Sequence, residues 1–155
     1  MSPVPHSSPS SLDSHLGFWL RYVSNHVSAR FQKLLEAQDI SVTEWVALRA
    51  LFDRDETTHA ALIGALGMTK GAASKIVSRL EERGLASRRQ AKGDAREQAL
   101  GLTHKGRALV PRLAALADDN DAHCFDHLAE HEREALMRLL RTYVAHHGLD
   151  SVPVS

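Results

Sequence analysis

The sequence predicts a mainly α-helical fold that carries one small β-hairpin. Three observations lead to this prediction. Apolar residues recur at steps of three and four over much of the chain, two short helical segments meet at a glycine-containing turn, and one basic stretch has an extended, two-residue pattern. The chain has 155 residues, of which 43% are hydrophobic and 25% charged, which suits one domain with a core of its own.

The first periodic segment predicts a helix from about residue 12 to residue 37. At a rise of 1.5 Å per residue such a helix is about 37 Å long. This is longer than a small core requires, so we expect it to extend toward a partner subunit. One helical stripe contains Leu12, Leu16, Leu20, Val23, Val27, Phe31 and Leu34, and Trp19 and Leu35 widen it.

Three shorter helices are expected next, each after a residue whose side chain can cap it. Thr43, Thr58 and Thr69 precede segments that run to about residues 52, 66 and 83. Gly67 can supply the left-handed residue that ends the second of these helices. Two short helices separated by a glycine-containing turn are typical of a helix-turn-helix.

After Gly84 the pattern becomes extended. Residues 85–90 and 97–102 predict two short strands, and Gly93-Asp94 between them favours a turn. The sequence therefore predicts a hairpin directly after the helix-turn-helix, where it would form a wing.

Two helices are expected after the hairpin. Thr103 can cap the first, at about 104–127, in which Pro111 should cause a kink or delay the regular start. Ala129 offers no capping oxygen to the second, at about 130–146, so we expect that junction either to fray or to run on as one helix. The last helix is expected to bury Leu136, Leu139, Leu140 and Tyr143 or Val144.

The formal net charge of zero conceals an uneven distribution of charge. Residues 70–112 carry +7, whereas residues 1–69 carry −2 and residues 113–155 carry −5. Neutrality of the whole chain would argue against a polyanionic partner, but the basic middle third favours one.

The second helix of the helix-turn-helix has an apolar and a polar side. Ala73, Ile76, Val77 and Leu80 are expected to face inward. The outer face has small or hydroxyl residues that let a helix enter a major groove, and cations that reach phosphates or guanine. A solvated helix face is the alternative for this helix taken alone. The outer residues are Lys70, Gly71, Ser74, Lys75, Ser78 and Arg79.

The hairpin adds a second basic element. Arg88, Arg89, Lys92 and Arg96 lie within nine residues, and an arginine-rich tip can follow the phosphates and enter a minor groove. Asp94 could hold the Arg96 guanidinium in place. A solvated charged hairpin is the alternative, but a basic helix and a basic hairpin together predict a winged helix-turn-helix plus a helical dimerisation region.

The run from residue 66 to residue 109 resembles the MarR family of bacterial transcriptional regulators, and the flanking helices extend the resemblance to residues 12–147. The features that carry it are Leu66-Gly67-x-Thr69, Ser74-Lys75, Arg79-Leu80-Glu81, Gly84-Leu85, Arg88-Arg89, Asp94-x-Arg96 and Leu102-Thr103-x-x-Gly106-Arg107. It implies dimerisation helices at 12–37 and 104–147 and a DNA-binding domain at 41–103. Residues 1–11 are expected to be a disordered segment and 148–155 a tail.

The resemblance implies a homodimer that binds a pseudo-palindromic operator in double-stranded DNA, with half-sites about 10 bp apart. It makes Arg96 the minor-groove arginine and Asp94 its anchor. It also implies a repressor that a small effector, such as an aromatic acid or a phenol, releases from DNA. The residues expected at the DNA are Thr69, Lys70, Gly71, Ser74, Lys75, Arg79, Arg88, Arg89, Lys92, Asp94 and Arg96.

The effector site is expected between the dimerisation helices and the winged domain. His15, Trp19, Trp45 and Arg49 come from the two helices that would line it, and an arginine beside aromatic rings suits an aromatic carboxylate. Simple core packing of the two tryptophans is the alternative.

A histidine cluster offers a different hypothesis, a metal-responsive regulator or metal-binding protein. His123, His127 and His131 lie at spacing four and would share one face of a continuous helix. The stretch 127–131 also fits an H-x-x-E-H metallopeptidase pattern, but only 24 residues follow it. We expect no enzyme and no cofactor, and we expect Cys124 to be a buried, inert thiol rather than a redox sensor.

The sequence also indicates the cellular compartment of the protein. No secretory signal or membrane-spanning stretch is evident, and the one cysteine excludes an intramolecular disulfide framework. The sequence therefore predicts a cytoplasmic protein without membrane contact.

Overall fold

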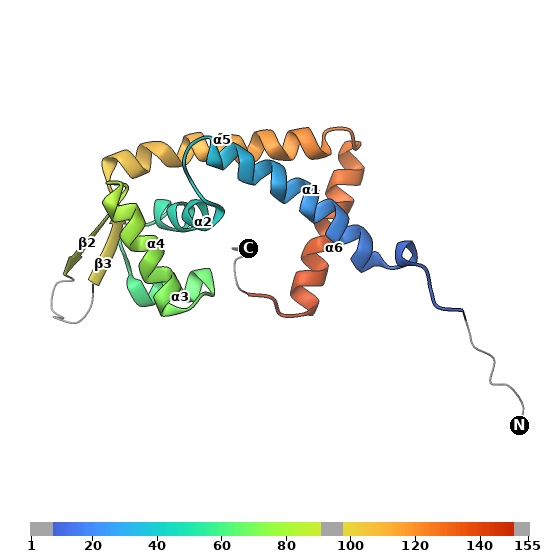
Figure 1. Cartoon of the computed structure of the whole chain (residues 1–155), viewed down its shortest axis with the longest axis horizontal. Coiled ribbons are helices and arrows are strands. Elements are labelled where there is room, and N and C mark those ends of the chain that lie inside the picture. The colour runs from blue at the N-terminus through green and yellow to red at the C-terminus, as the bar shows by residue number, and fades with distance from the viewer. Residues whose placement is uncertain (1–7, 91–97, 151–155) are drawn as a thin grey trace, which may run out of the picture.

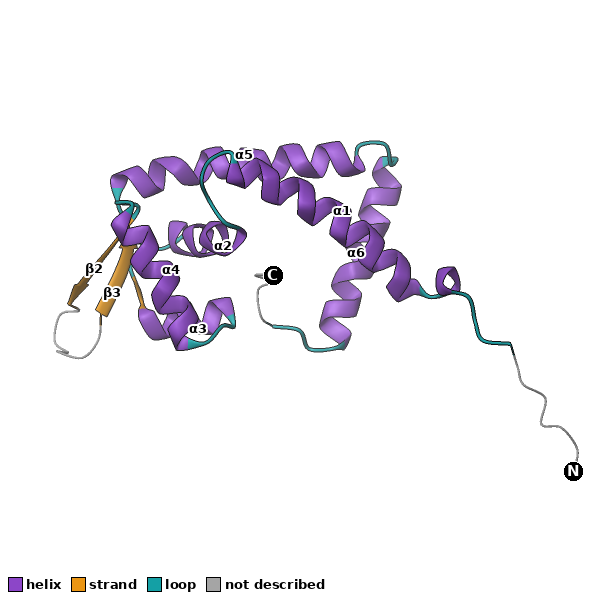
Figure 2. Ribbon diagram, viewed as in Figure 1, coloured by secondary structure: helices purple, strands orange, loops and turns teal. Residues whose placement is uncertain are grey.

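A computed structural model describes residues 8–90 and 98–150. It confirms a mainly helical fold with a small antiparallel sheet (Figures 1 and 2). The elements in chain order are η1 (Leu12–Ser14), α1 (Leu16–Glu36), α2 (Val42–Phe52), β1 (Thr57–Thr58), α3 (His59–Leu66), α4 (Lys70–Glu82), β2 (Ala86–Gln90), β3 (Gln98–Leu102), α5 (His104–Phe125) and α6 (Glu130–His146).

The two long helices organise the molecule. α1 and α5 pack against each other along one edge, and α2, α3, α4 and the sheet gather at one end of this pair (Figure 1). At the other end α6 turns away from the end of α5. The helix-turn-helix and the apolar helix α6 are therefore at opposite ends of the chain's fold.

The sheet has the order β1-β3-β2, with both pairs antiparallel. β2 and β3 pair from Ala86 opposite Leu102 to Gln90 opposite Gln98, which confirms the predicted hairpin. β1 was not predicted because two residues are too few to show an alternating pattern. Its second residue, Thr58, also caps α3 by accepting a hydrogen bond from the backbone N–H of Ala61.

The core lies where the winged domain meets the two long helices. Its largest fully buried side chains come from α1, α2, α3, α4, β3 and α5, and from the residue just before β2. They are Leu35, Leu48, Leu51, Leu62, Leu66, Val77, Leu80, Leu85, Leu100, Val110 and Leu113. This core fixes α4 and the hairpin against α5.

Two predicted helix starts were wrong. The first segment begins as a short 3-10 turn, and the α-helix starts only at Leu16. The N-cap of α2 is Ser41, not Thr43. The Ser41 hydroxyl accepts from the backbone N–H of Glu44 (3.1 Å), and the Glu44 carboxylate accepts from the backbone N–H of Ser41 (3.0 Å). This reciprocal pair forms a capping box.

The C-terminal helices follow the predicted order with different details. α5 begins directly after its cap Thr103 and continues through Pro111, so its start is not delayed. It ends at Phe125, and a turn separates it from α6, so the two do not form one helix. The Glu132 carboxylate accepts from the backbone N–H of Ala129 (3.3 Å), while Ala129 itself has no side-chain oxygen to cap the first turn of α6.

The sequence predicted that the apolar residues of α6 are buried, but within one chain they are exposed. Leu139 and Tyr143 are each 57% exposed, and Leu16 at the start of α1 is 83% exposed. The chain thus presents an apolar surface at the end opposite the winged domain. Its members are Leu12, Leu16, Trp19, Leu20, Tyr22 and Val23 from the first segment and Leu136, Met137, Leu139, Leu140, Tyr143 and Val144 from α6.

Among the described residues, no helix combines the length and the apolar character needed to cross a membrane.

Candidate nucleic-acid interface

Helix α4 separates its buried and exposed residues as the sequence predicted. Ala73, Ile76, Val77 and Leu80 are buried. Thr69 caps the helix by accepting from the backbone N–H of Ala72 (3.2 Å). Gly67 has a φ of 62°, which places it in the left-handed region that ends α3.

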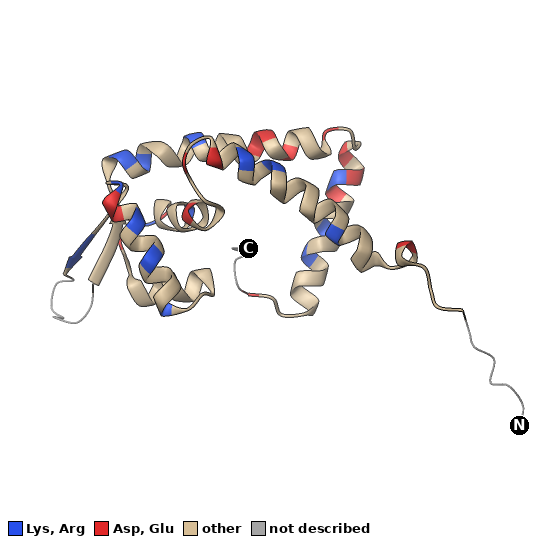
Figure 3. Ribbon diagram, viewed as in Figure 1, with Lys and Arg blue, Asp and Glu red and all other residues tan. Residues whose placement is uncertain are grey.

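The outer face of α4 carries the side chains that were expected at the DNA. Lys70, Gly71, Lys75 and Arg79 are exposed, and Ser74 is half-buried. Lysine and arginine residues occur on α4, on β2 and in the first turns of α5 (Figure 3). This end of the molecule therefore offers cations and small residues on one protruding helix beside a strand.

His59 is a member of this surface that sequence reasoning missed. Its Nε2 lies 3.3 Å from the Ser74 hydroxyl, and both residues line a hollow of about 410 Å³ that also includes Lys70 and Arg88. Burial lowers the pKa of His59 below 6.5, and the cations Arg88 and Lys70 lower it further. No local sequence signal links two residues that lie 15 positions apart.

Arg88 joins the wing to α4. Its side chain forms an ion pair with Glu81 and donates a hydrogen bond to the hydroxyl of Ser78 (2.9 Å). These contacts hold strand β2 against α4, the expected recognition helix of the helix-turn-helix, so a direct DNA contact by Arg88 stays a prediction. Its neighbour Arg89 is largely exposed and pairs with Glu56.

Three of the residues expected at the DNA belong to the segment between β2 and β3. Lys92, Asp94 and Arg96 lie outside the described residues. The expected minor-groove role of Arg96 and its pairing with Asp94 therefore stay predictions.

The motif Leu102-Thr103-x-x-Gly106-Arg107, which follows the wing, connects neighbouring elements by hydrogen bonds. The Thr103 hydroxyl donates to the carbonyl of Gly84 (2.6 Å) and accepts from the backbone N–H of Gly106 (3.1 Å). Arg107 donates to the carbonyls of Phe52 (3.0 Å) and Arg54 (3.3 Å) at the end of α2. The wing, α2 and α5 are thereby connected.

Glu44 is a second residue that sequence reasoning missed. It is one of the two buried polar or charged residues in the described chain, and its carboxylate lies between α2 and the C-terminal half of α4. There it pairs with Arg79 (3.4 Å) and Arg83 (3.6 Å). A glutamate three residues after a serine indicates a capping box, but the sequence alone does not reveal these arginine partners.

The four expected effector residues do not share one pocket within a single chain. Trp19 donates to the carbonyl of Asp13 (2.8 Å), whereas Trp45 packs edge-on against Phe31. Trp19 and Phe31 are twelve residues apart on α1, or about 18 Å along the helix axis. His15 lies exposed at the start of α1, and Arg49 pairs with Asp53 (2.8 Å).

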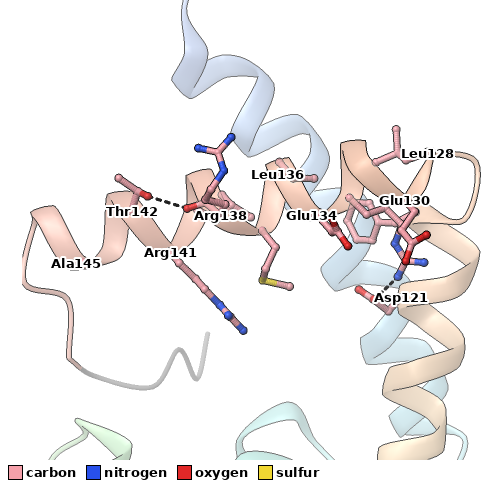
Figure 4. A pocket seen from close by; sticks show the side chains of 13 residues that line it. Asp121, Leu128, Glu130, Glu134, Leu136, Arg138, Arg141, Thr142 and Ala145 are labelled. Carbon is pink, nitrogen blue, oxygen red and sulfur yellow. Dashed lines mark hydrogen bonds and ion pairs between the residues drawn. The ribbon is translucent and has the colours of Figure 1, made fainter.

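A hollow of about 1160 Å³ lies at the other end of the molecule, between the end of α5 and α6 (Figure 4). Its lining includes the apolar residues Leu136 and Leu140 and the cations Arg138 and Arg141, all from α6. The hollow adjoins the apolar surface of α6 and is open rather than enclosed.

The histidine cluster is not assembled. His123 is in α5, His127 is in the turn after it and His131 is in α6, so the three do not share one helix face. Within residues 8–90 and 98–150, no three His, Cys, Asp or Glu side chains are grouped in a way that could hold a metal ion. Cys124 is half-buried, with its Sγ 4.0 Å from the amide oxygen of Asn120.

The chain is similar in sequence to known transcriptional regulators. Residues 40–98 match the MarR family. The transcriptional regulator HosA of Escherichia coli is 29% identical over 122 residues, which cover 79% of this chain and 89% of HosA. The transcriptional repressor NicR of Pseudomonas putida is 28% identical over 138 residues, which cover 89% of this chain and 87% of NicR.

Solved structures share the fold. BpsR of Bordetella bronchiseptica, whose DNA binding is regulated by 6-hydroxynicotinic acid, is 26% identical with a TM-score of 0.76, over 88% of this chain and 97% of BpsR. A MarR mutant from Escherichia coli, complexed with operator DNA, is 22% identical with a TM-score of 0.74, over 83% of this chain and 93% of that chain.

Proposed function

This chain belongs to the MarR family of DNA-binding transcriptional regulators, and on that premise we propose that it is a homodimeric repressor released from its operator by a small aromatic acid or phenol. The relatives are regulators rather than enzymes, and so is this protein. The single observation that carries the proposal is the exposed face of α4, where Lys70, Ser74 and Lys75 lie beside the basic strand β2.

The chemistry of this face supports duplex recognition. Gly71 and Ser74 are small enough to let α4 approach base edges, while Lys70, Lys75 and Arg79 lie where phosphates would flank the groove. The wing, with Arg89 and the tip that contains Lys92 and Arg96, would follow the adjacent backbone. Residues 41–103 would thus form the DNA-binding domain.

The exposed apolar surface of α1 and α6 supports a dimer. Leucine, valine and aromatic side chains at these levels of exposure favour burial against a second copy. Residues 12–37 and 104–147 would form that interface. Two-fold symmetry would then place two α4 helices about one helical turn of DNA apart, on a pseudo-palindromic operator in the cytoplasm.

The effector class rests on the relatives and on side chains of this chain. NicR is a repressor, and the DNA binding of BpsR responds to a hydroxylated aromatic acid. Here His15 precedes α1 and Trp19 lies in its first turn, and α2 carries Trp45 and Arg49. A dimer could bring these two groups together from different chains, with Arg49 as the partner of a carboxylate.

Selection from a random-sequence duplex library tests the function. We expect wild-type protein to enrich a pseudo-palindrome, and we expect an aromatic acid such as 6-hydroxynicotinic acid to weaken its binding. Failure to enrich any duplex would contradict DNA recognition. Binding that no aromatic acid or phenol alters would contradict only the effector class.

A further inference from the structure

The buried carboxylate of Glu44 links α2 to the recognition helix. Its side chain is only 4% exposed, and it accepts from the backbone N–H of Ser41 (3.0 Å). It also pairs with Arg79 Nε through Oε1 (3.4 Å) and with an Arg83 terminal nitrogen through Oε2 (3.6 Å). A buried carboxylate needs such partners, because an unpaired one would be strongly unfavourable.

Arg83 pairs with one oxygen of this carboxylate and also contacts the turn before α2. It donates a hydrogen bond to the backbone carbonyl of Asp39 and pairs with the Asp39 carboxylate (3.7 Å). Asp39 has a φ of 58°, so the turn that connects α1 to α2 has a left-handed residue at this point. The position of Glu44 is thus fixed by α2, by the turn before it and by the end of α4.

Arg79 is different from Arg83 because most of it faces solvent. Its Nε approaches Glu44, while 63% of its side chain remains exposed, so its terminal amino groups stay accessible. On α4 it follows Lys75 by four residues and Ser78 by one, at the edge of the face that points away from the core. A guanidinium can serve two acceptors in different directions at once, which an ammonium on a flexible stem does poorly.

We propose that Glu44 is a positioning residue, which holds the Arg79 guanidinium in the pose that binds a DNA phosphate beside the recognition helix. This inference rests on the proposed DNA-binding function. It assigns to Glu44 an effect on affinity without any contact to DNA. The physical reason is preorganisation: a restrained arginine loses less conformational freedom when it meets the phosphate.

The sign of the effect of Glu44→Gln separates positioning from simple electrostatics. The substitution makes the protein more positive by one charge, so long-range electrostatics alone predicts tighter binding to DNA. Positioning predicts weaker binding, by about tenfold, with the slope of log affinity against log salt reduced by about one. The probe is the duplex that wild-type protein enriches most from a random library.

Asp53→Asn is the matched control. It makes the same change in charge and removes an exposed ion pair with Arg49 at the end of α2. We expect it to leave the affinity unchanged or slightly higher. Equal effects of Glu44→Gln and Asp53→Asn would overturn the proposal.

A double-mutant cycle distinguishes positioning from a general structural role. If Glu44 acts through Arg79, then Glu44→Gln should have little further effect in an Arg79→Ala background. Full additivity of the two losses would overturn the proposal. Should Glu44→Gln fail to fold, Arg79→Lys decides: we expect it to bind nearly as weakly as Arg79→Ala, and wild-type affinity in Arg79→Lys would overturn the proposal. If wild-type protein enriches no duplex, the proposed function itself fails.

Discussion

Gly106 lies where the first turn of α5 passes closest to the backbone before the wing. A Cβ at this position would lie 2.0 Å from the carbonyl oxygen of Leu85 and 2.9 Å from its carbonyl carbon. These are backbone atoms, so no side chain can move aside to make room. The glycine is therefore required by packing and not by its own φ angle.

We expect Gly106→Ala to lower the free energy of unfolding by about 3 kcal/mol or to prevent folding, because it overpacks a rigid contact. Gly64→Ala in α3 is the control, since a Cβ there meets nothing within 4 Å. It should raise the free energy of unfolding by about 0.5–1 kcal/mol through helix propensity. Urea denaturation of both variants measures this, and equal stability of Gly106→Ala and wild type would contradict the close approach.

His59 gives the folded state a dependence on pH. Its pKa is below 6.5 because burial and then the neighbouring Arg88 and Lys70 disfavour the imidazolium. As the pH falls through 6.5, the unfolded chain therefore takes up a proton at this residue more readily than the folded chain does. The stability that His59 contributes is therefore present above pH 6.5 and is lost as the pH falls toward its folded pKa.

An NMR titration of the histidine ring protons tests this, with the His59 signal assigned by its absence in His59→Gln. We expect its midpoint below pH 6.5. We also expect the free energy of unfolding of His59→Gln to fall less than that of wild type between pH 7 and pH 5. A midpoint at or above 6.5 would show that the environment of His59 differs from the one in this fold.

Residue types on helix α4 were predictable, but their partners were not. The inward face followed from the spacing of Ala73, Ile76, Val77 and Leu80. The pairing of Ser74 with His59, of Ser78 with Arg88 and of Arg79 with Glu44 depends on how separate elements pack. A sequence pattern has no information about such distant contacts. The residues expected to face DNA were therefore predicted without the residues that contact them.

Among the elements, α2 shows most clearly how local sequence can mislead. Thr43 and Ser41 are both capping residue types, and the apolar pattern after them does not distinguish between them. In the structure Ser41 is the cap, because Glu44 lies three residues later. The Glu44 carboxylate accepts from the Ser41 backbone N–H, and the Ser41 hydroxyl accepts from the Glu44 backbone N–H. Helices α3 and α6, which lack such competing caps, were predicted with their correct bounds.

This assignment predicts that Ser41→Ala lowers the free energy of unfolding by about 1 kcal/mol, since one backbone N–H at the start of α2 loses its acceptor. Thr43→Ala removes only a contact with the Ser41 hydroxyl and should cost less. Thermal unfolding of the two variants measures the difference. A larger loss for Thr43→Ala would identify Thr43 as the cap after all.

The distribution of charge becomes meaningful only for the whole molecule. Several basic residues lie on α4, β2 and the start of α5, and several acidic residues lie on the second half of α5 and the start of α6 (Figure 3). The formal charges of the chain cancel to zero, yet residues 70–112 carry +7 and residues 113–155 carry −5. Such a field would orient the winged end toward DNA and the acidic end away from it.

The apolar surface formed by the start of α1 and by α6 is exposed and does not belong to the core of the single chain. Amphipathic spacing predicted that α6 would bury Leu139 and Leu140, but among the described residues of one chain both side chains remain exposed. A periodic pattern indicates that a face is buried, but it does not indicate which chain covers it. The long α1 presents a matching apolar stripe that starts with Leu16 and Leu20.

A dimer through this surface would make Leu20→Glu disruptive, because the exposed leucine would become a charge buried at the interface. Asn25→Glu is the matched control, since Asn25 lies five residues later on the opposite side of α1 and is exposed. Light scattering after size-exclusion chromatography should show a dimer for wild type and Asn25→Glu and a monomer for Leu20→Glu. The monomer should also bind the enriched duplex at least about 100-fold more weakly, because a single α4 reads only one half-site. A dimeric Leu20→Glu variant would show that the two copies meet elsewhere.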